Sequence, residues 1–136
     1  MLFRSRINES ERSNGEERYL RNMKRRSNSG MRLRYKKQKE TLTVFLEGEI
    51  DQNNAGEIRG AIDRLLCDAT IELLVFDLRQ VSFMDSSGIG ILLGRYRLMT
   101  ARGGRIAIRE PRENIVRILK IAGIYKIAEE CGGTLK

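Results

Sequence analysis

Two adjacent hydroxyl side chains, Ser86 and Ser87, follow Asp85 in a short polar segment between two apolar runs. The run before it, residues 71–78, predicts a buried strand, and the run after it predicts a helix. The start of a helix has free backbone N–H groups and the positive end of the helix dipole, which stabilise a phosphate or another anion. Alternatively, the three side chains only cap the helix. We call this segment the Ser86 turn. It is the candidate functional site, and the sequence leaves open whether it binds an anion or only caps the helix.

The sequence lacks the residues that most hydrolytic chemistry needs. It contains no histidine, so it has no Ser-His-Asp or Cys-His nucleophile pair and no His-ligated metal site. A nucleophile elbow around Ser86, G-x-S-x-G, would need glycine at Met84. Cys67 and Cys131 are too few for a four-thiolate zinc site and fit a reducing cytosol. We expect no enzyme activity, no metal and no cofactor.

Three glycines, Gly88, Gly90 and Gly94, form GxGxxxG and miss the dinucleotide-binding pattern GxGxxG by one position. They fall inside the helical pattern and not before it. We therefore interpret them as positions of close backbone packing against the sheet.

The chain carries a net charge of +8, and half of it lies in residues 1–30. This segment is dense in Arg, Glu, Ser and Asn without a sustained apolar period, which predicts a disordered extension. It lacks interleaved aromatic residues and glutamates offset its charge, so we expect no nucleic-acid partner. Patterned sequence begins at Met31. Because Arg25-Arg26-Ser27 can be encoded by a purine-rich ribosome-binding sequence, a native translation start at Met31 is a further hypothesis.

The length of 136 residues suits one domain, which we place at residues 31–136. No apolar run reaches the roughly 20 residues of a membrane span, and none near the N-terminus suits a signal peptide. We expect a cytoplasmic protein with no membrane contact.

Strand and helix patterns alternate along this domain. Strands are predicted at 31–37, 41–47, 71–78 and 105–109, with a weaker one from Tyr125 to Ala128, and helices at 54–67, 86–101 and 111–121. This order predicts an α/β fold in which helices pack on a mixed β-sheet of four to five strands.

The predicted fold brings two polar segments together. Functional loops in such sheets follow the carboxyl ends of strands, so the Ser86 turn and the Asp51-Gln52-Asn53 loop are expected to meet at one edge. Asp51 has an alternative role as a helix-capping acid. We expect the helix that starts at Ser86 to bury Leu92, Leu93 and Tyr96.

Three blocks of the sequence resemble the STAS domain of bacterial anti-sigma factor antagonists. They are Gly48-Glu49-Ile50-Asp51, Phe83-Met84-Asp85-Ser86-Ser87-Gly88-Ile89-Gly90 and Leu93-Gly94-Arg95-Tyr96. The similarity runs from about Met31 to Ala128 and is closest to the sporulation antagonists of anti-sigma F factors. It implies a STAS-like sheet and a small binding protein that phosphorylation switches.

The resemblance also implies a site and its partners. In this family the first serine after the aspartate, here Ser86, is phosphorylated by the anti-sigma factor, which is itself a serine kinase. The unphosphorylated form binds the anti-sigma factor and frees the sigma factor, and a PP2C-type phosphatase restores it. The predicted partner-binding residues are Asp51, Gln52, Asn53, Met84, Asp85, Ser86, Ser87, Gly88 and Ile89. The alternative function is a stand-alone STAS module that senses a nucleotide or another small anion at the same helix start.

Overall fold

The computed structural model describes residues 17–19 and 31–131, which form one mixed sheet with helices packed on it. In spatial order the strands are β1 (Glu17–Tyr19), β2 (Arg32–Gln38), β3 (Thr41–Ile50), β4 (Leu73–Met84), β5 (Arg105–Arg109) and β6 (Glu129–Cys131). β1, β2 and β3 pair antiparallel, and β3, β4, β5 and β6 pair parallel. The predicted α/β fold is confirmed, and two three-residue strands, β1 and β6, extend its four longer strands.

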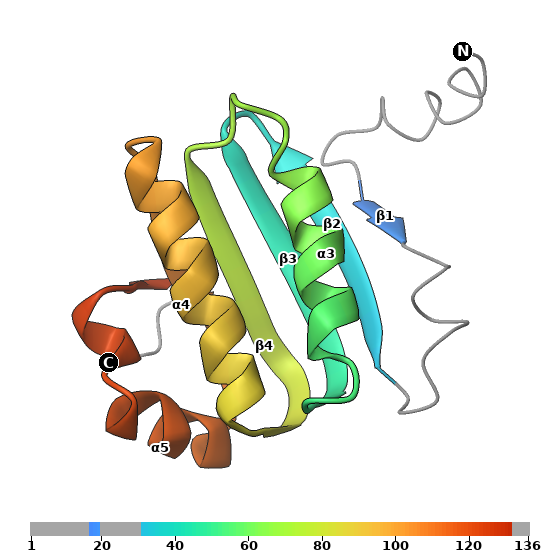
Figure 1. Cartoon of the computed structure of the whole chain (residues 1–136), viewed down its shortest axis with the longest axis vertical. Helices are drawn as coiled ribbons and strands as arrows, with labels where there is room; N and C mark the ends of the chain where they lie inside the picture. The colour runs from blue at the N-terminus through green and yellow to red at the C-terminus, as the bar shows by residue number, and fades with distance from the viewer. Residues whose placement is uncertain (1–16, 20–30, 132–136) are drawn as a thin grey trace.

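Three helices and one short 3-10 turn connect the parallel strands. They are α3 (Ala55–Leu65), α4 (Ser86–Ala101), α5 (Glu113–Ile121) and η1 (Ile124–Lys126). α3 and α4 cross between parallel neighbours and lie side by side over the same face of the sheet (Figure 1). Both start at the edge of the sheet where β3 and β4 end, so the residues that precede the two helices are neighbours in space.

The core lies between these two helices and the sheet. On β3 and β4, alternate side chains face the helices and are buried, namely Leu42, Val44, Leu46, Leu74, Phe76 and Leu78. α3 contributes Ile58 and Ile62, which lie four residues apart on one face of the helix. The alternation that predicted the strand at 41–47 therefore also selects its buried face.

α4 differs from its prediction in the side chains that it buries. Leu92 is buried as expected, whereas Leu93 and Tyr96 are only partly buried. Arg95 is buried in their place, and its Nε lies 3.1 Å from Oδ1 of Asp63 on α3. Burial lowers the pKa of Arg95, and the carboxylate of Asp63 opposes that shift. A charged pair therefore joins the two helices.

The last strand is not where the sequence predicted it. Residues Tyr125 to Ala128 were expected to form a strand, but η1 occupies Ile124–Lys126 and the strand follows at Glu129–Cys131. The backbone N–H groups of Ile127 and Ala128 both donate to the carbonyl of Ile124 at 3.0 Å. This prediction was wrong because local hydrogen bonds hold the segment in a turn before it reaches β5.

The N-terminal prediction was wrong for three residues. Residues 17–19 were expected to be disordered, but they form β1, which pairs antiparallel with β2. In the described sheet, β2 is therefore an inner strand between β1 and β3. An unpaired strand offers backbone hydrogen-bonding groups along its whole length, and a short segment of almost any sequence can use them. Residues 1–16 and 20–30 lie outside the described residues, so the domain boundary stays a prediction.

Candidate functional site

The Ser86 turn joins the end of β4 directly to α4. The strand predicted at 71–78 continues to Met84, and its last residues, Phe83 and Met84, pair with Glu49 and Ile50 of β3. Asp85 has an extended backbone and is the N-cap residue, and Ser86 is the first residue of the helix. The turn is therefore shorter than predicted.

Asp85 caps α4 with its side chain. Its Oδ1 accepts a hydrogen bond from the backbone N–H of Ser87 at 2.8 Å. The carboxylate thereby satisfies one of the free N–H groups of the first turn and places negative charge at the positive end of the helix dipole. The capping role that the sequence left open for Asp85 is confirmed.

The two serines differ in exposure. Ser86 is exposed to solvent, whereas Ser87 is half-buried. Within the described residues, neither hydroxyl donates to or accepts from another residue. A large partner can therefore reach the hydroxyl of Ser86 more easily than that of Ser87.

The loop between β3 and α3 is held by its own side chains. Oδ1 of Asp51 accepts hydrogen bonds from the backbone N–H groups of Asn53 at 2.9 Å and Asn54 at 3.3 Å. The N-cap residue of α3 is Asn54, whose side-chain amide donates to the carbonyl of Glu49 at 2.8 Å. Asp51 therefore organises the loop before the helix and does not occupy the capping position itself.

The structure brings the two loops together. The backbone N–H of Asp85 donates to the carbonyl of Ile50 at 3.3 Å, and Ile50 is the register partner of Met84. Gly88 completes the junction, since a Cβ atom at this position would overlap Cγ of Met84 and lie 3.2 Å from a methyl group of Ile50. A side chain at position 88 would therefore force the buried side chain of Met84 to move.

The other two glycines of the GxGxxxG pattern have a different environment. A Cβ atom at Gly90 or Gly94 would meet no atom within 4 Å, so neither packs closely against the sheet. The predicted reason for glycine is confirmed at Gly88 and was wrong at Gly90 and Gly94. On a helix, these two positions fall outside the buried stripe.

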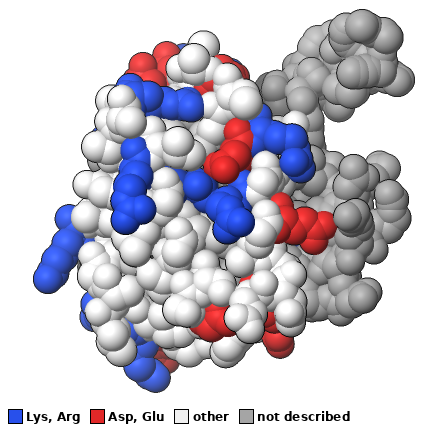
Figure 2. Space-filling model, in the orientation of Figure 1, with Lys and Arg blue, Asp and Glu red and all other residues white. Residues whose placement is uncertain are grey.

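The surroundings of the two loops are acidic. Residues 47–58 contain Glu47, Glu49, Asp51 and Glu57 and no lysine or arginine, and residues 80–94 contain Asp85 as their single charged residue. Figure 2 shows acidic side chains at the lower edge of this face, below α3 and α4, with basic side chains to their left and side chains of both signs higher up. This local charge has the opposite sign to the net charge of +8 of the chain.

Two further findings concern ligands and membranes. Among residues 17–19 and 31–131, no three His, Cys, Asp or Glu side chains are grouped as the ligands of a metal ion would be. In the same part of the chain, no helix combines the length and the apolar character of a membrane span.

Comparison with known proteins decides the family. The family model for the STAS domain matches residues 32–135 of the chain. The chain belongs to the STAS domain family. The family that its sequence blocks predicted is therefore confirmed, and the Ser86 turn lies within the matched residues.

The STAS domain described here is similar to anti-sigma factor antagonists in sequence and in structure. It is 36% identical over 86 residues to an anti-sigma F factor antagonist of Paenibacillus polymyxa, a match that covers 63% of this chain and 74% of that protein. Its fold matches the anti-sigma factor antagonist SpoIIAA in its unphosphorylated form with a TM-score of 0.65 and 26% identity, over 73% of this chain and 87% of that one. For the Bacillus cell fate determinant SpoIIAA in the phosphorylated form, the TM-score is 0.60 and the identity 26%, over 73% of this chain and 90% of that one.

The predicted partner-binding residues of this STAS domain fall into three classes of exposure. Gln52, Asn53 and Ser86 are exposed, Asp51, Asp85, Ser87 and Ile89 are half-buried, and Met84 and Gly88 are buried. The two buried residues support the turn from below and do not lie on its surface. Phe83, which is not among the predicted residues, is 45% exposed although it is large and apolar. The strand alternation around buried Met84 was the signal that could have placed Phe83 on the opposite face.

Proposed function

We propose that this STAS protein is a cytoplasmic anti-sigma factor antagonist that is switched by phosphorylation of Ser86. The unphosphorylated form binds an anti-sigma factor, itself a serine kinase, and thereby frees a sigma factor. Phosphorylation of Ser86 ends this binding, and a PP2C-type phosphatase restores it. The observation that carries the proposal is the exposed Ser86 hydroxyl at the start of α4, beside the Asp51 loop.

The geometry favours Ser86 over Ser87 as the phosphorylated residue. Ser86 is exposed at the first helical position, so a kinase can reach its hydroxyl without unwinding the helix. Ser87 is half-buried, and Asp85 holds its backbone N–H. The similarity to SpoIIAA, for which a phosphorylated form has been solved, supports a serine switch in this chain as well.

A phosphate on Ser86 would change binding more than folding. It adds roughly 1.5 to 2 negative charges at a helix N-terminus, where the helix dipole stabilises them. A partner surface that fits a neutral hydroxyl would instead meet a dense anion. An unpaired charge at a buried contact costs on the order of 2–5 kcal/mol, which weakens affinity by roughly 30-fold to several thousand-fold.

The proposed contact surface consists of residues that are accessible at the two loops. They are Asp51, Gln52, Asn53, Asp85, Ser86, Ser87 and Ile89. Because residues 47–58 and 80–94 carry five carboxylates and no lysine or arginine, the part of the anti-sigma factor that meets these two loops should be basic, and binding should weaken as salt is added. The same acidic surroundings disfavour the alternative of a sensor for a nucleotide or another small anion.

The test is incubation of the full chain with an anti-sigma factor kinase and ATP. We expect one phosphate per chain on wild type and on Ser87→Ala, and none on Ser86→Ala. Ser86→Ala should bind the anti-sigma factor and resist inactivation, whereas Ser86→Asp should fold and bind poorly. Phosphopeptide mapping to Ser87, or a Ser86 phospho-form that binds with unchanged affinity, would overturn the assignment.

The binding face has a separate test. Asp51→Ala and Ile89→Ala should each weaken binding of the anti-sigma factor, and Arg117→Ala, on the exposed side of α5, should not. Circular dichroism verifies that each variant is folded. If both loop variants bound like wild type while folded, the contact surface would lie on another face.

A further inference from the structure

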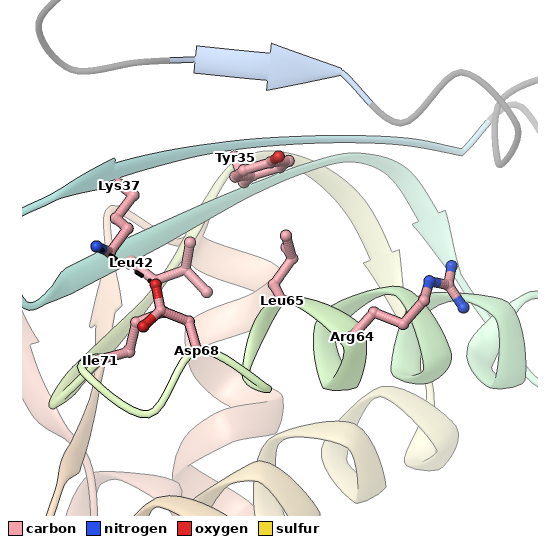
Figure 3. A pocket seen from close by; sticks show the side chains of 7 residues that line it. All are labelled: Tyr35, Lys37, Leu42, Arg64, Leu65, Asp68 and Ile71. Atoms are coloured by element: carbon pink, nitrogen blue, oxygen red, sulfur yellow. Dashed lines mark ion pairs between the residues drawn. The ribbon is translucent and has the colours of Figure 1, made fainter. Parts of the chain in front are cut away.

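A pocket of about 410 Å³ lies between β2 and the C-terminal end of α3. Its lining side chains are Tyr35, Lys37, Leu42, Arg64, Leu65, Asp68 and Ile71 (Figure 3). Pockets that bind small molecules span about 300 to 1,000 Å³ and combine apolar walls with a few polar groups. The size of this pocket is therefore that of a small-molecule site, and its lining combines three apolar side chains with four polar or charged ones.

The pocket is separate from the Ser86 turn. Leu42 lies near the start of β3, and Ile71 lies just before β4 begins. Ser86 follows the opposite, carboxyl end of β4. The two sites are therefore at opposite ends of the same sheet, and a ligand in the pocket would not touch the switch.

The apolar part of the pocket is preformed. Leu42 and Ile71 are each 1% exposed and form its floor, and Tyr35 and Leu65 are partly buried against the core. Tyr35 and Lys37 occupy alternate positions of β2, so both project from the same face of the strand.

The loop that forms one wall is held rigidly. The guanidinium group of Arg102, just after α4, donates hydrogen bonds to the backbone carbonyls of Leu66, Asp68 and Ile71. Asp68 in turn accepts hydrogen bonds from the hydroxyl and the backbone N–H of Thr70, at 2.6 and 3.0 Å. A ligand would therefore meet a wall that needs little reordering on binding.

The charges of the pocket are divided between its two ends. At one end, Nζ of Lys37 lies 3.4 Å from Oδ2 of Asp68, so this pair is neutral as a whole. Figure 3 shows Arg64 at the other end, with the side chains of Tyr35 and Leu65 between the two ends and with its guanidinium group directed away from them along α3. Within the described residues, Arg64 forms no ion pair. The lining therefore carries one net positive charge, and that charge is located at Arg64.

From this arrangement we propose that the pocket binds a small monoanionic amphipath, an aryl or alkyl carboxylate. The apolar body lies over Leu42 and Leu65 beside the ring of Tyr35, and the exposed side chain of Arg64 turns toward the pocket on binding and pairs with the carboxylate. Charge complementarity decides the class, since the net positive charge of the lining attracts an anion and repels a cation. This inference does not depend on the proposed function, because it concerns the other end of the sheet.

The test is a titration of the ¹⁵N-labelled full chain with 4-phenylbutyrate, followed by amide chemical shifts. We expect saturable shifts around residues 35–42 and 64–71 and none at residues 85–88. The amide of the same acid, 4-phenylbutanamide, has the same shape without the charge and should bind about tenfold more weakly, since a charge-assisted contact contributes about 1.4 kcal/mol or more.

Two variants complete the test. Arg64→Gln should bind 4-phenylbutyrate no better than the amide, while Arg97→Gln, which removes an exposed arginine of α4, should bind both like wild type. The proposal fails if 4-phenylbutyrate causes no saturable shift, if the amide binds equally well, or if Arg64→Gln leaves the preference for the carboxylate unchanged. It also fails if the shifts map to the Ser86 turn, and none of these results would bear on phosphorylation of Ser86.

Discussion

The backbone N–H of Asp85 donates a hydrogen bond to the backbone carbonyl of Ile50 at 3.3 Å, so α4 starts against the last residue of β3. Gly88, one turn into α4, packs on the same residue and on Met84. The β3–α3 loop and the Ser86 turn are therefore joined by backbone contacts below the surface. Substitutions of the buried residues in this junction should change stability, whereas substitutions of the exposed residues of the two loops should change binding.

The first prediction compares two glycines of α4. Gly88→Ala should lower the free energy of unfolding by about 1–3 kcal/mol, because its methyl group overlaps the buried side chain of Met84. Gly90→Ala has open space and should raise it by up to about 1 kcal/mol through helix propensity. Urea unfolding of both variants and of wild type measures whether each substitution lowers or raises the free energy of unfolding. Equal effects would contradict the close packing at Gly88.

The second prediction concerns the cap of α4. Asp85→Ala removes the acceptor for the N–H of Ser87 and should cost about 0.5–2 kcal/mol of stability. Asp85→Asn keeps an acceptor oxygen and should therefore lose less stability than Asp85→Ala. Thermal and urea unfolding measure both variants. A larger loss for asparagine than for alanine would show that the cap is not the main role of this side chain.

The third prediction concerns the ion pair between α3 and α4. Only 8% of the Arg95 side chain is exposed, against 42% for Asp63, so removing the carboxylate leaves a buried cation without its partner. Asp63→Ala should therefore lower the free energy of unfolding by about 1–3 kcal/mol. This loss is smaller than the loss expected for a fully buried ion pair, because Asp63 is partly solvated.

A double-mutant cycle checks this argument. Arg95→Met replaces the cation with an apolar side chain of similar length, and adding Asp63→Ala to Arg95→Met should cost much less than Asp63→Ala alone. Urea unfolding of the four proteins gives the coupling energy. Additive effects would mean that the two side chains do not stabilise each other.

The fourth prediction is a pH dependence at Asp68. A hydrogen bond from the Thr70 hydroxyl is the main cause that lowers the pKa of Asp68 below its ordinary value of 3.8. A lowered pKa contributes stability above the ordinary value, and this contribution is lost as the pH falls through the folded-state pKa. Thr70→Val should therefore raise the pKa of Asp68 and should destabilise the protein slightly at pH 7.

Two measurements separate this effect from general damage. An NMR titration of the Asp68 carboxyl carbon should show the higher pKa in Thr70→Val and no change in Thr100→Val, a matched substitution at an exposed position of α4. The stability difference between wild type and Thr70→Val should shrink when the pH is lowered from 7 to 3. A stability difference that stayed constant from pH 7 to pH 3 would contradict the coupling between the ionisation of Asp68 and stability.

Periodicity along the chain was sufficient to predict most of the elements. The alternation of Leu42, Val44 and Leu46 predicts a strand and its buried face, and both are confirmed. The cap at Asp85 could also be predicted, because an N-cap bond joins residues two or three positions apart. These features depend on side-chain spacing within one element, which any sequence displays directly.

Tertiary structure decided the features that depend on residues far apart in the chain. The burial of Arg95 requires Asp63 on the neighbouring helix, and the need for glycine at position 88 requires Ile50 from the neighbouring strand. β1 exists as a strand because β2 provides a backbone to pair with. The 410 Å³ pocket likewise forms only where β2 meets the end of α3. Spacing within a single element carries no information on such contacts, because the register of the sheet and the packing of the helices set them.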